Sequence, residues 1–430
     1  MKTHLQARRR AAFTLVELML AVAIMLVLAA ILVAAVYKVL GTTKQVTTAQ
    51  DIRELQLALE SFKGQYGFYP PSRLKLCAKQ SEYGTTQLDV DSQAWLTRMF
   101  PKITDPNNSP WVNAAVSPGW IQWDGQYGNP PSSPPVEPSP VILEGDQCLT
   151  FFLGGIPTPL NPPTLGASYN ASQTYALTGF SQNPYNPAAQ RTQQGEVRIS
   201  FFDFTSYANE GRLVVLSTLP PVGAPPTYPA STSFSSSGTS FSPAGVNRSL
   251  AQPSLLDVYT YKNVPYDKNN LLQWRPYLYF SSYKAADGYN RYKVDGSLAT
   301  NGFSSGTGVW TDAWTDCPTF TDPRTPDPST PSQYYRAPAQ PPVTSPTQTV
   351  GVWPYVANVN ASSGYITFQN SNTFQIVCAG KDGLFGSGSD QLLTHIWPPA
   401  ASAYSLNDPS INDWKDDQSN FCATVMGISR

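Results

Sequence analysis

The sequence predicts an α+β protein in which a long N-terminal helix, membrane-spanning in its first half, packs on a globular domain with an antiparallel sheet and long proline-rich loops. Two observations predict the helix: an uncharged apolar run fills residues 18–37, and apolar residues then recur at three- and four-residue steps as far as Phe62. A third observation predicts the sheet, because short segments rich in β-branched and aromatic residues alternate with turns after Pro70.

Composition excludes several classes of function. The chain has 430 residues with 28 Lys and Arg against 29 Asp and Glu, so it lacks the excess of positive charge that binding to nucleic-acid phosphates requires. His4 and His395 are its only 2 histidines, and they offer no His-based catalytic or zinc constellation. We therefore expect no nucleic-acid partner and no enzymatic activity.

The N-terminus carries the most informative pattern. Lys2 and the three arginines at 8–10 precede an apolar stretch in which Glu17 is the only charge. As a helix, residues 18–37 cover about 30 Å, the thickness of the hydrocarbon core, and the positive-inside rule keeps the basic end in the cytoplasm. A signal peptide cleaved near 34–35 and a plain membrane anchor are the alternatives. The plain anchor leaves the carboxylate unexplained, since burying one in a membrane costs at least about 2.5 kcal/mol.

Residues 12–20, Ala-Phe-Thr-Leu-Val-Glu-Leu-Met-Leu, follow the basic leader and resemble the N-terminus of type IV pilins and of the pseudopilins of type II secretion. The resemblance implies that a prepilin peptidase cuts between Ala12 and Phe13 and methylates the new amino group. It also implies that Glu17, the fifth mature residue, meets the Phe13 ammonium of a neighbouring subunit and sets the axial register of a fibre. The family usually has Gly before the cut, where this chain has Ala12.

The helix is expected to continue beyond the membrane as an amphipathic segment. Apolar residues such as Leu55 and Phe62 alternate with charged ones, so this half lays an apolar stripe on the domain. The glycines at 64 and 67 and the prolines at 70 and 71 then end the helix. The predicted parts are a prepilin leader at 1–12, a transmembrane and polymerisation helix at 13–62, and an extracytoplasmic globular domain with insertions at 63–430.

Further elements are predicted in order along the domain. A short helix with Asp91 as its cap is predicted at 91–100, and a compact apolar run fills 148–156. Strands are predicted, from β-branched and aromatic content between turns, at 197–204, 212–216, 276–283, 365–368 and 374–378. Proline-rich loops are predicted at 130–140, 219–244 and 318–346.

A glycine-rich turn and a later acidic segment predict a calcium (Ca²⁺) site near the C-terminus. Asp382 belongs to the turn, and Asp416 and Asp417 belong to the acidic segment. Ca²⁺ takes about six to eight oxygen ligands, which tight turns supply as backbone carbonyls beside Asp side chains. The block resembles the C-terminal calcium loop of major pseudopilins, but it has a long insertion at 391–410. Either Asp390, at the edge of this insertion, or Asp408, within it, could serve as a substitute ligand. An ordinary Asp-Gly turn with a solvated acidic surface is the alternative.

The cysteines all lie beyond the membrane helix, where disulfides can persist: Cys77, Cys148, Cys317, Cys378 and Cys422. No Cys-x-x-Cys pair is present, so a metal or redox site is not indicated. We expect buried free thiols. Cys378 and Cys422 flank the predicted calcium segment, and a disulfide between them, which would hold the two ends of that segment together, is the alternative.

Taken together, these features predict a pseudopilin of a type II secretion system in the bacterial inner membrane, single-pass, with a cytoplasmic N-terminus and a periplasmic domain. The resemblance implies a polymer of this chain with itself and other pseudopilins, prepilin peptidase as processing enzyme, and the inner-membrane secretion platform as partner. A type IV pilus subunit, major or minor, for adhesion or motility is the alternative within the family. A membrane-anchored binding or hydrolytic domain is the alternative from another class.

Overall fold

The computed structural model of the protein describes these residues: 15–123, 140–159, 175–177, 179–189, 197–214, 247–248, 252–259, 276–283, 288–289, 291–292, 296–299, 303–304, 309–310, 354–360, 365–380 and 418–422. The chain forms two compact units, residues 1–47 and 48–430. The described part of the first unit is helical, and the strands found among the described residues belong to the second.

Helix α1 (Leu15–Tyr66) confirms the prediction of one long N-terminal helix. It runs without interruption through Gly41 and Gly64 and ends at Tyr66 rather than at the predicted Phe62. Gly67 ends it because its φ of 73° lies in the left-handed region, where its N–H donates to the Lys63 carbonyl at 2.6 Å. Within the described residues, no helix combines the length and the apolar character needed to cross a membrane.

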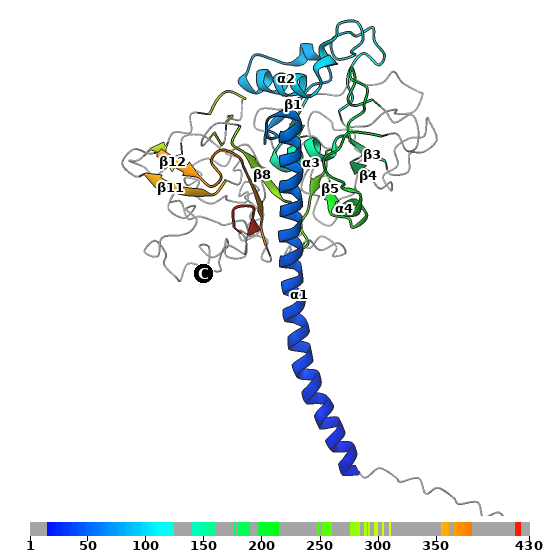
Figure 1. Ribbon diagram of the computed structural model, residues 1–430, viewed down its shortest axis with the longest axis vertical. Helices are drawn as coiled ribbons and strands as arrows, with labels where there is room; N and C mark the ends of the chain where they lie inside the picture. Colours follow the sequence, from blue (N-terminus) through cyan, green and yellow to red (C-terminus); the bar gives the residue numbers. More distant parts are fainter. Residues whose placement is uncertain are drawn as a thin grey trace, which may run out of the picture. The chain divides into compact units, whose positions relative to one another are not determined.

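The second half of α1 supplies the centre of the core, as its amphipathic pattern predicts. Leu55, Leu59 and Phe62 are each 0% exposed. Helix α3 (Gly145–Gly154), which contains most of the apolar run at 148–156, is buried along its whole length, and its Phe152 ring meets Phe62 edge-on at 5.6 Å. Figure 1 shows α3 beside this half of α1. Each fully buried side chain of this size contributes about 1.5–3 kcal/mol.

The predicted antiparallel sheet is formed by β8 (Leu278–Ser281), β13 (Phe374–Cys378) and β14 (Gln418–Ser419), with β13 in the middle. Strand β13 matches the strand predicted at 374–378, and β8 lies within 276–283. Strand β12 (Tyr365–Phe368) likewise matches its prediction and pairs with β11 (Val356–Asn360) in an antiparallel hairpin. These predictions are confirmed.

A second sheet departs from the all-antiparallel prediction. Strand β1 (Leu74–Leu76) is antiparallel to β2 (Val141–Leu143), but β6 (Asn247–Arg248) runs parallel to β2. A parallel pair needs a long crossover connection, and the stretch between β2 and β6, which includes α3, provides it.

Helix α2 (Gln87–Met99) begins earlier than the helix predicted at 91–100. Thr86 is its N-cap, because its hydroxyl accepts the backbone N–H of Asp89 at 3.3 Å. The prediction that Asp91 caps the helix is therefore wrong. The Asp91 carboxylate instead accepts hydrogen bonds from Arg291 at 2.9 Å and Tyr292 at 2.6 Å, a long-range role that its local sequence does not reveal.

The prediction of a strand at 197–204 is wrong. Within this segment only Ile199 forms a β-bridge, and its partner is Phe180. The N–H groups of Phe201 and Phe202 both point to the Leu153 carbonyl at the end of α3, at 2.8 and 3.2 Å, which turns the chain away from a strand path. Of the predicted strand 212–216, β5 (Leu213–Val214) is present. The proline-rich segments 219–244 and 318–346, and 130–140 apart from Pro140, lie outside the described residues.

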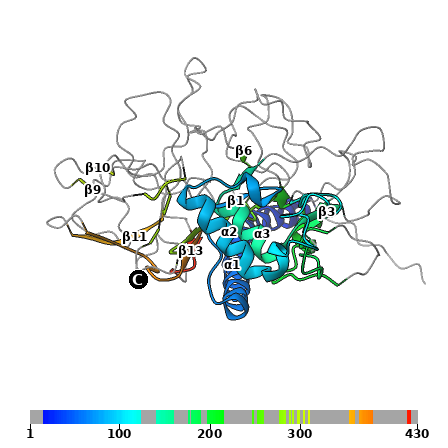
Figure 2. The same ribbon diagram turned by 90° about the horizontal axis from the view of Figure 1, so that it is seen from above.

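The remaining elements are short: η1 (Gln80–Glu82), η2 (Pro101–Thr104), β3 (Pro157–Pro159), β4 (Tyr175–Leu177), α4 (Thr205–Asn209), β7 (Ser254–Leu255), β9 (Phe303–Ser304) and β10 (Val309–Trp310). Strand β5 pairs with β7, β3 with β4, and β9 with β10. Figures 1 and 2 agree in placing the β11–β12 hairpin and the β3–β4 pair on opposite sides of α1.

Candidate functional site

The first unit presents an apolar helical surface to solvent. Leu15, Val16 and Met25 are 74%, 72% and 69% exposed, and the other large apolar side chains described between 15 and 32 are exposed as well. A contiguous apolar surface of this kind marks contact with a membrane or a protein partner, because water solvates it at a cost of about 25 cal/mol per Å². This segment is therefore the first candidate site.

Glu17 lies in the first turn of α1, on this exposed segment. The unsatisfied N–H groups of a helix N-terminus favour a negative charge there. The other two residues of the predicted cleavage and assembly site, Ala12 and Phe13, lie outside the described residues.

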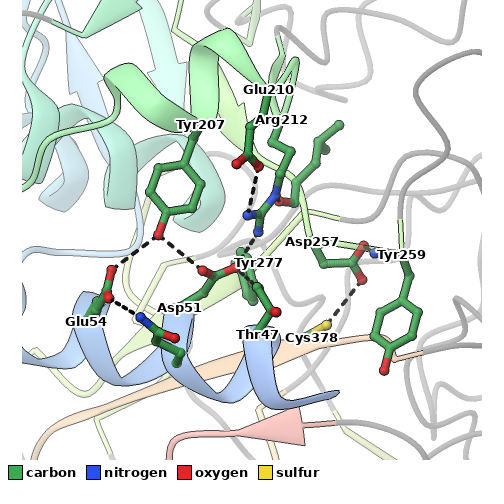
Figure 3. Close-up of polar contacts among 12 residues, drawn as sticks. Thr47, Asp51, Glu54, Tyr207, Glu210, Arg212, Asp257, Tyr259, Tyr277 and Cys378 are labelled. Atoms are coloured by element: carbon green, nitrogen blue, oxygen red, sulfur yellow. Dashed lines mark hydrogen bonds and ion pairs between the residues drawn. The ribbon is translucent and has the colours of Figure 1, made fainter. Parts of the chain in front are cut away.

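In the second unit, a buried polar cluster anchors α1 to the domain (Figure 3). Its centre is Asp51, which is 4% exposed. The Asp51 carboxylate forms an ion pair with Arg212 and accepts hydrogen bonds from the hydroxyls of Tyr207 at 3.1 Å and Tyr277 at 2.8 Å. Because these partners come from α4, from the residue before β5 and from the residue before β8, one carboxylate holds α1 against three parts of the domain.

The Arg212 guanidinium makes three further contacts besides the ion pair with Asp51. Its Nε donates to the Leu256 carbonyl at 3.0 Å, and its Nη1 lies 3.6 Å from Glu210. The guanidinium also lies over the Tyr207 ring, 4.8 Å from the centroid. A buried charge is tolerated when it is paired and hydrogen-bonded in this way, so the cluster joins α1 to the rest of the second unit.

Electrostatics keep both tyrosines of the cluster protonated. Burial, together with the negative charge of Asp51, raises the pKa of Tyr277 well above its ordinary value. Burial and the charges of Asp51 and Glu54 raise the pKa of Tyr207 in the same direction. Both hydroxyls therefore remain hydrogen-bond donors at any physiological pH.

Reasoning from the sequence missed this cluster. Asp51 is one of the charged residues that alternate with apolar ones in this part of the helix, a pattern typical of a solvent-facing side. The sequence did contain a signal for its burial. Asp51 lies four residues before Leu55 and eleven before Phe62, and in a helix this spacing places it on the same buried face. An acidic residue on such a face predicts a cationic partner, although nothing local identifies Arg212 as that partner.

The residues predicted to bind calcium, Asp382, Asp416 and Asp417, lie outside the described residues. Strand pairing brings together the two ends of the segment that carries them, since Cys378 of β13 is the register partner of Gln418 of β14. In the described ranges no group of three or more His, Cys, Asp or Glu side chains is close enough to hold a metal ion.

The alternative of a disulfide between Cys378 and Cys422 is not observed. The Cys378 thiol lies 3.2 Å from Asp257 Oδ2, to which it donates, and 3.4 Å from the N–H of Gly380. Cys77 is a buried free thiol, as expected, and burial raises its pKa to about 12.

Helix α1 thus combines exposed apolar side chains in its N-terminal part with a C-terminal part anchored in the core of the second unit. Residues 7–33 match the family model described as the prokaryotic N-terminal methylation motif, the prepilin motif of type IV pilins and pseudopilins. The chain thus carries this motif, which indicates a structural subunit rather than an enzyme. Comparison with curated proteins and with solved structures gives no match.

Proposed function

We propose that the protein is a pseudopilin of a type II secretion system, processed by prepilin peptidase and polymerised into a periplasmic pseudopilus. The observation that carries the proposal is the prepilin motif at 7–33, which leads directly into a continuous helix with exposed apolar side chains. Before assembly this helix would lie in the inner membrane, with the basic leader in the cytoplasm.

The chemistry of assembly would centre on Glu17 and on the amino group created at Phe13. A carboxylate inside a membrane or a helical core is costly without a cation, at least about 2.5 kcal/mol. The Phe13 ammonium of the next subunit would supply that cation, and the pair would fix the axial spacing between subunits. Partners under this proposal are other copies of the chain, other pseudopilins, prepilin peptidase and the inner-membrane secretion platform.

Sequencing the N-terminus of the membrane-extracted protein tests the processing step. We expect the chain to start at N-methylated Phe13. A start at Met1 or after Ala35 would contradict it. Assembly is tested by Glu17→Ala, for which we expect loss of crosslinked multimers and of secretion, whereas Glu60→Ala, an acidic residue on the domain half of the same helix, should retain both.

Secretion and pilus functions predict different phenotypes. A null strain should accumulate exoproteins in the periplasm if the chain is a pseudopilin. Loss of surface fibres, adhesion or twitching with intact secretion would instead support a type IV pilus subunit, for which the proline-rich insertions are suited.

Ca²⁺ binding by Asp382, Asp416 and Asp417 is the second part of the proposal. The pairing of β13 with β14 supports this proposal. It brings Cys378 and Gln418, which flank the segment carrying the three aspartates, next to each other in the sheet. Adding EDTA should lower the thermal midpoint of the wild-type protein, and excess Ca²⁺ but not Mg²⁺ should restore it. Asp382→Ala should abolish the response. Equal midpoints with and without EDTA would support the ordinary Asp-Gly turn.

A further inference from the structure

The C-terminal strand β14 closes one edge of a sheet. Strand β13 has β8 on one side and β14 on the other, so β14 covers an edge that would otherwise be open. The register partners are Val377 with Ser419 and Cys378 with Gln418. Both residues of β14 are buried, each 5% exposed. Residues 418–422, which include β14, are called the strap below.

Asn420 fastens the strap to β13. Its backbone N–H donates to the Ile376 carbonyl at 3.2 Å, and its side-chain Oδ1 accepts the Ile376 N–H at 2.9 Å. Its Nδ2 donates to the Phe374 carbonyl at 3.1 Å. Asn420 thus satisfies three backbone groups of β13, whereas the backbone of one residue in a regular antiparallel ladder exchanges at most two bonds with its partner.

The strap also contacts two neighbouring elements. Gln56 Nε2 of α1 donates to the Asn420 carbonyl at 3.5 Å. The Phe421 ring lies 5.7 Å from the ring of Tyr355, the residue before β11. Figure 1 shows the strap in red beside α1. The strap therefore joins β13 to α1 and to the base of the β11–β12 hairpin.

The edge beneath the strap is suited to pairing with another strand. Strand β13 reads Phe-Gln-Ile-Val-Cys, without charge or proline, and each of its residues is at most 3% exposed. Natural sheets keep open edges from pairing with other chains by means of charges, prolines or bulges. An uncovered β13 would present unpaired N–H and C=O groups on an uncharged apolar segment. A second copy of this edge would carry no opposing charge, so two copies are able to pair as antiparallel strands across a two-fold axis.

The connection to the strap favours its separate release. Residues 379–417 lie between β13 and the strap in the sequence. Closing so long a connection costs more chain entropy than closing a tight hairpin, and the contacts of the strap must offset that cost. Release of the strap would leave β13 paired with β8, where the register covers Phe374 to Val377. The strap is thus able to open as a local unit while the rest of the sheet stays intact.

We infer that the strap is a conformational device that closes the edge of β13, with Asn420 as its positioning residue, and that its release lets β13 pair with β13 of a second copy. This inference goes beyond the proposed function and does not depend on it. The strap and β13 lie in the second unit, whereas the proposed assembly contact uses Phe13 and Glu17. In a fibre subunit the closed strap would keep the domains from associating through the wrong surface.

Hydrogen exchange followed by mass spectrometry, on the full chain in detergent micelles, measures opening of the strap. Asn420→Ala removes two side-chain hydrogen bonds, so we expect the peptide that contains β13 to exchange about 30-fold faster than in the wild type. The peptide that contains α3 should exchange as in the wild type, which shows that the core remains folded. Asn107→Ala, the same substitution at an exposed position, is the matched control and should leave both peptides unchanged.

Sedimentation at increasing protein concentration measures pairing of the open edge. Both chains in this comparison carry Glu17→Ala, which removes the proposed helix contact. We expect the chain with Asn420→Ala to form dimers and the chain with the native strap to remain monomeric. An excess of a synthetic peptide of residues 415–424 should suppress these dimers, because it supplies the strap from outside.

Several results would overturn the inference. The first is unchanged exchange of β13 in Asn420→Ala, and the second is faster exchange without dimers. Dimers that require an intact Glu17 would assign the contact to α1 and would likewise reject the strap. If Asn420→Ala also loses protection of α3, Asn420→Asp decides the matter, since it keeps the acceptor for the Ile376 N–H and loses the donor to Phe374: faster exchange of β13 supports the inference and unchanged exchange overturns it. Loss of fibre assembly with the expected behaviour of the strap would reject the proposed function alone.

Discussion

Replacing Asp51 with Ala should destabilise the domain strongly, because it removes the centre of the buried cluster. Removing one partner of a buried ion pair costs about 3–5 kcal/mol. The contacts give the same range: the Tyr277 hydroxyl and Arg212 Nη2 each lose the acceptor that Asp51 provides, and each buried donor left unsatisfied costs about 1–3 kcal/mol. Tyr207 loses less, because its hydroxyl also lies 3.3 Å from Glu54.

The assay is urea unfolding of the full chain in detergent, followed by tryptophan fluorescence. The urea concentrations at the unfolding midpoint are compared between variants whose m-values are equal. Arg53→Ala is the matched control, since Arg53 is exposed on the same helix only two residues away, and it should stay within about 0.5 kcal/mol of the wild type. Asp51→Leu combined with Arg212→Met removes both charges and should be much more stable than Asp51→Ala alone.

A double-mutant cycle separates the pair from its surroundings. Asp51→Ala and Arg212→Ala should be less costly together than the sum of the two, because the second substitution removes a charge that is already unpaired. The reasoning fails if Asp51→Ala lies within about 1 kcal/mol of the wild type, or if the two substitutions are additive.

Two further predictions concern acid stability and backbone geometry. Burial raises the pKa of Asp89, but hydrogen bonds from Lys75 at 2.5 Å and from Thr86 outweigh it, so the pKa lies below its ordinary value. Its stabilisation should be complete above about pH 4 and lost as the pH falls below that, and Asp89→Asn should flatten this part of a pH titration of the unfolding midpoint; an unchanged slope would contradict the assignment. Gly155→Ala should cost more than Gly211→Ala, because both glycines have positive φ but a Cβ at 155 would lie 2.3 Å from the Gly179 backbone, whereas at 211 nothing lies within 4 Å. Equal thermal midpoints for the two variants would show that the close approach carries no penalty.

Local patterns predicted the elements whose formation depends on neighbours in sequence. The three- and four-residue spacing of Leu55 and Phe62 predicted the buried face of α1, and the β-branched segments predicted β12 and β13 at their observed positions. The predictions failed where a distant contact overrode local preference. The segment 197–204 has strand composition, yet the end of α3 turns it, and Asp91 looks like a cap but binds Arg291, 200 residues away.

The sequence by itself determined the N-terminal motif and the long apolar helix, because both are patterns of contiguous residues. Only the tertiary structure decided the buried anchor of α1. Asp51 meets Arg212 across 161 positions and Tyr277 across 226. Such sites depend on which segments pack together, a choice made by burial of the whole core rather than by any local pattern.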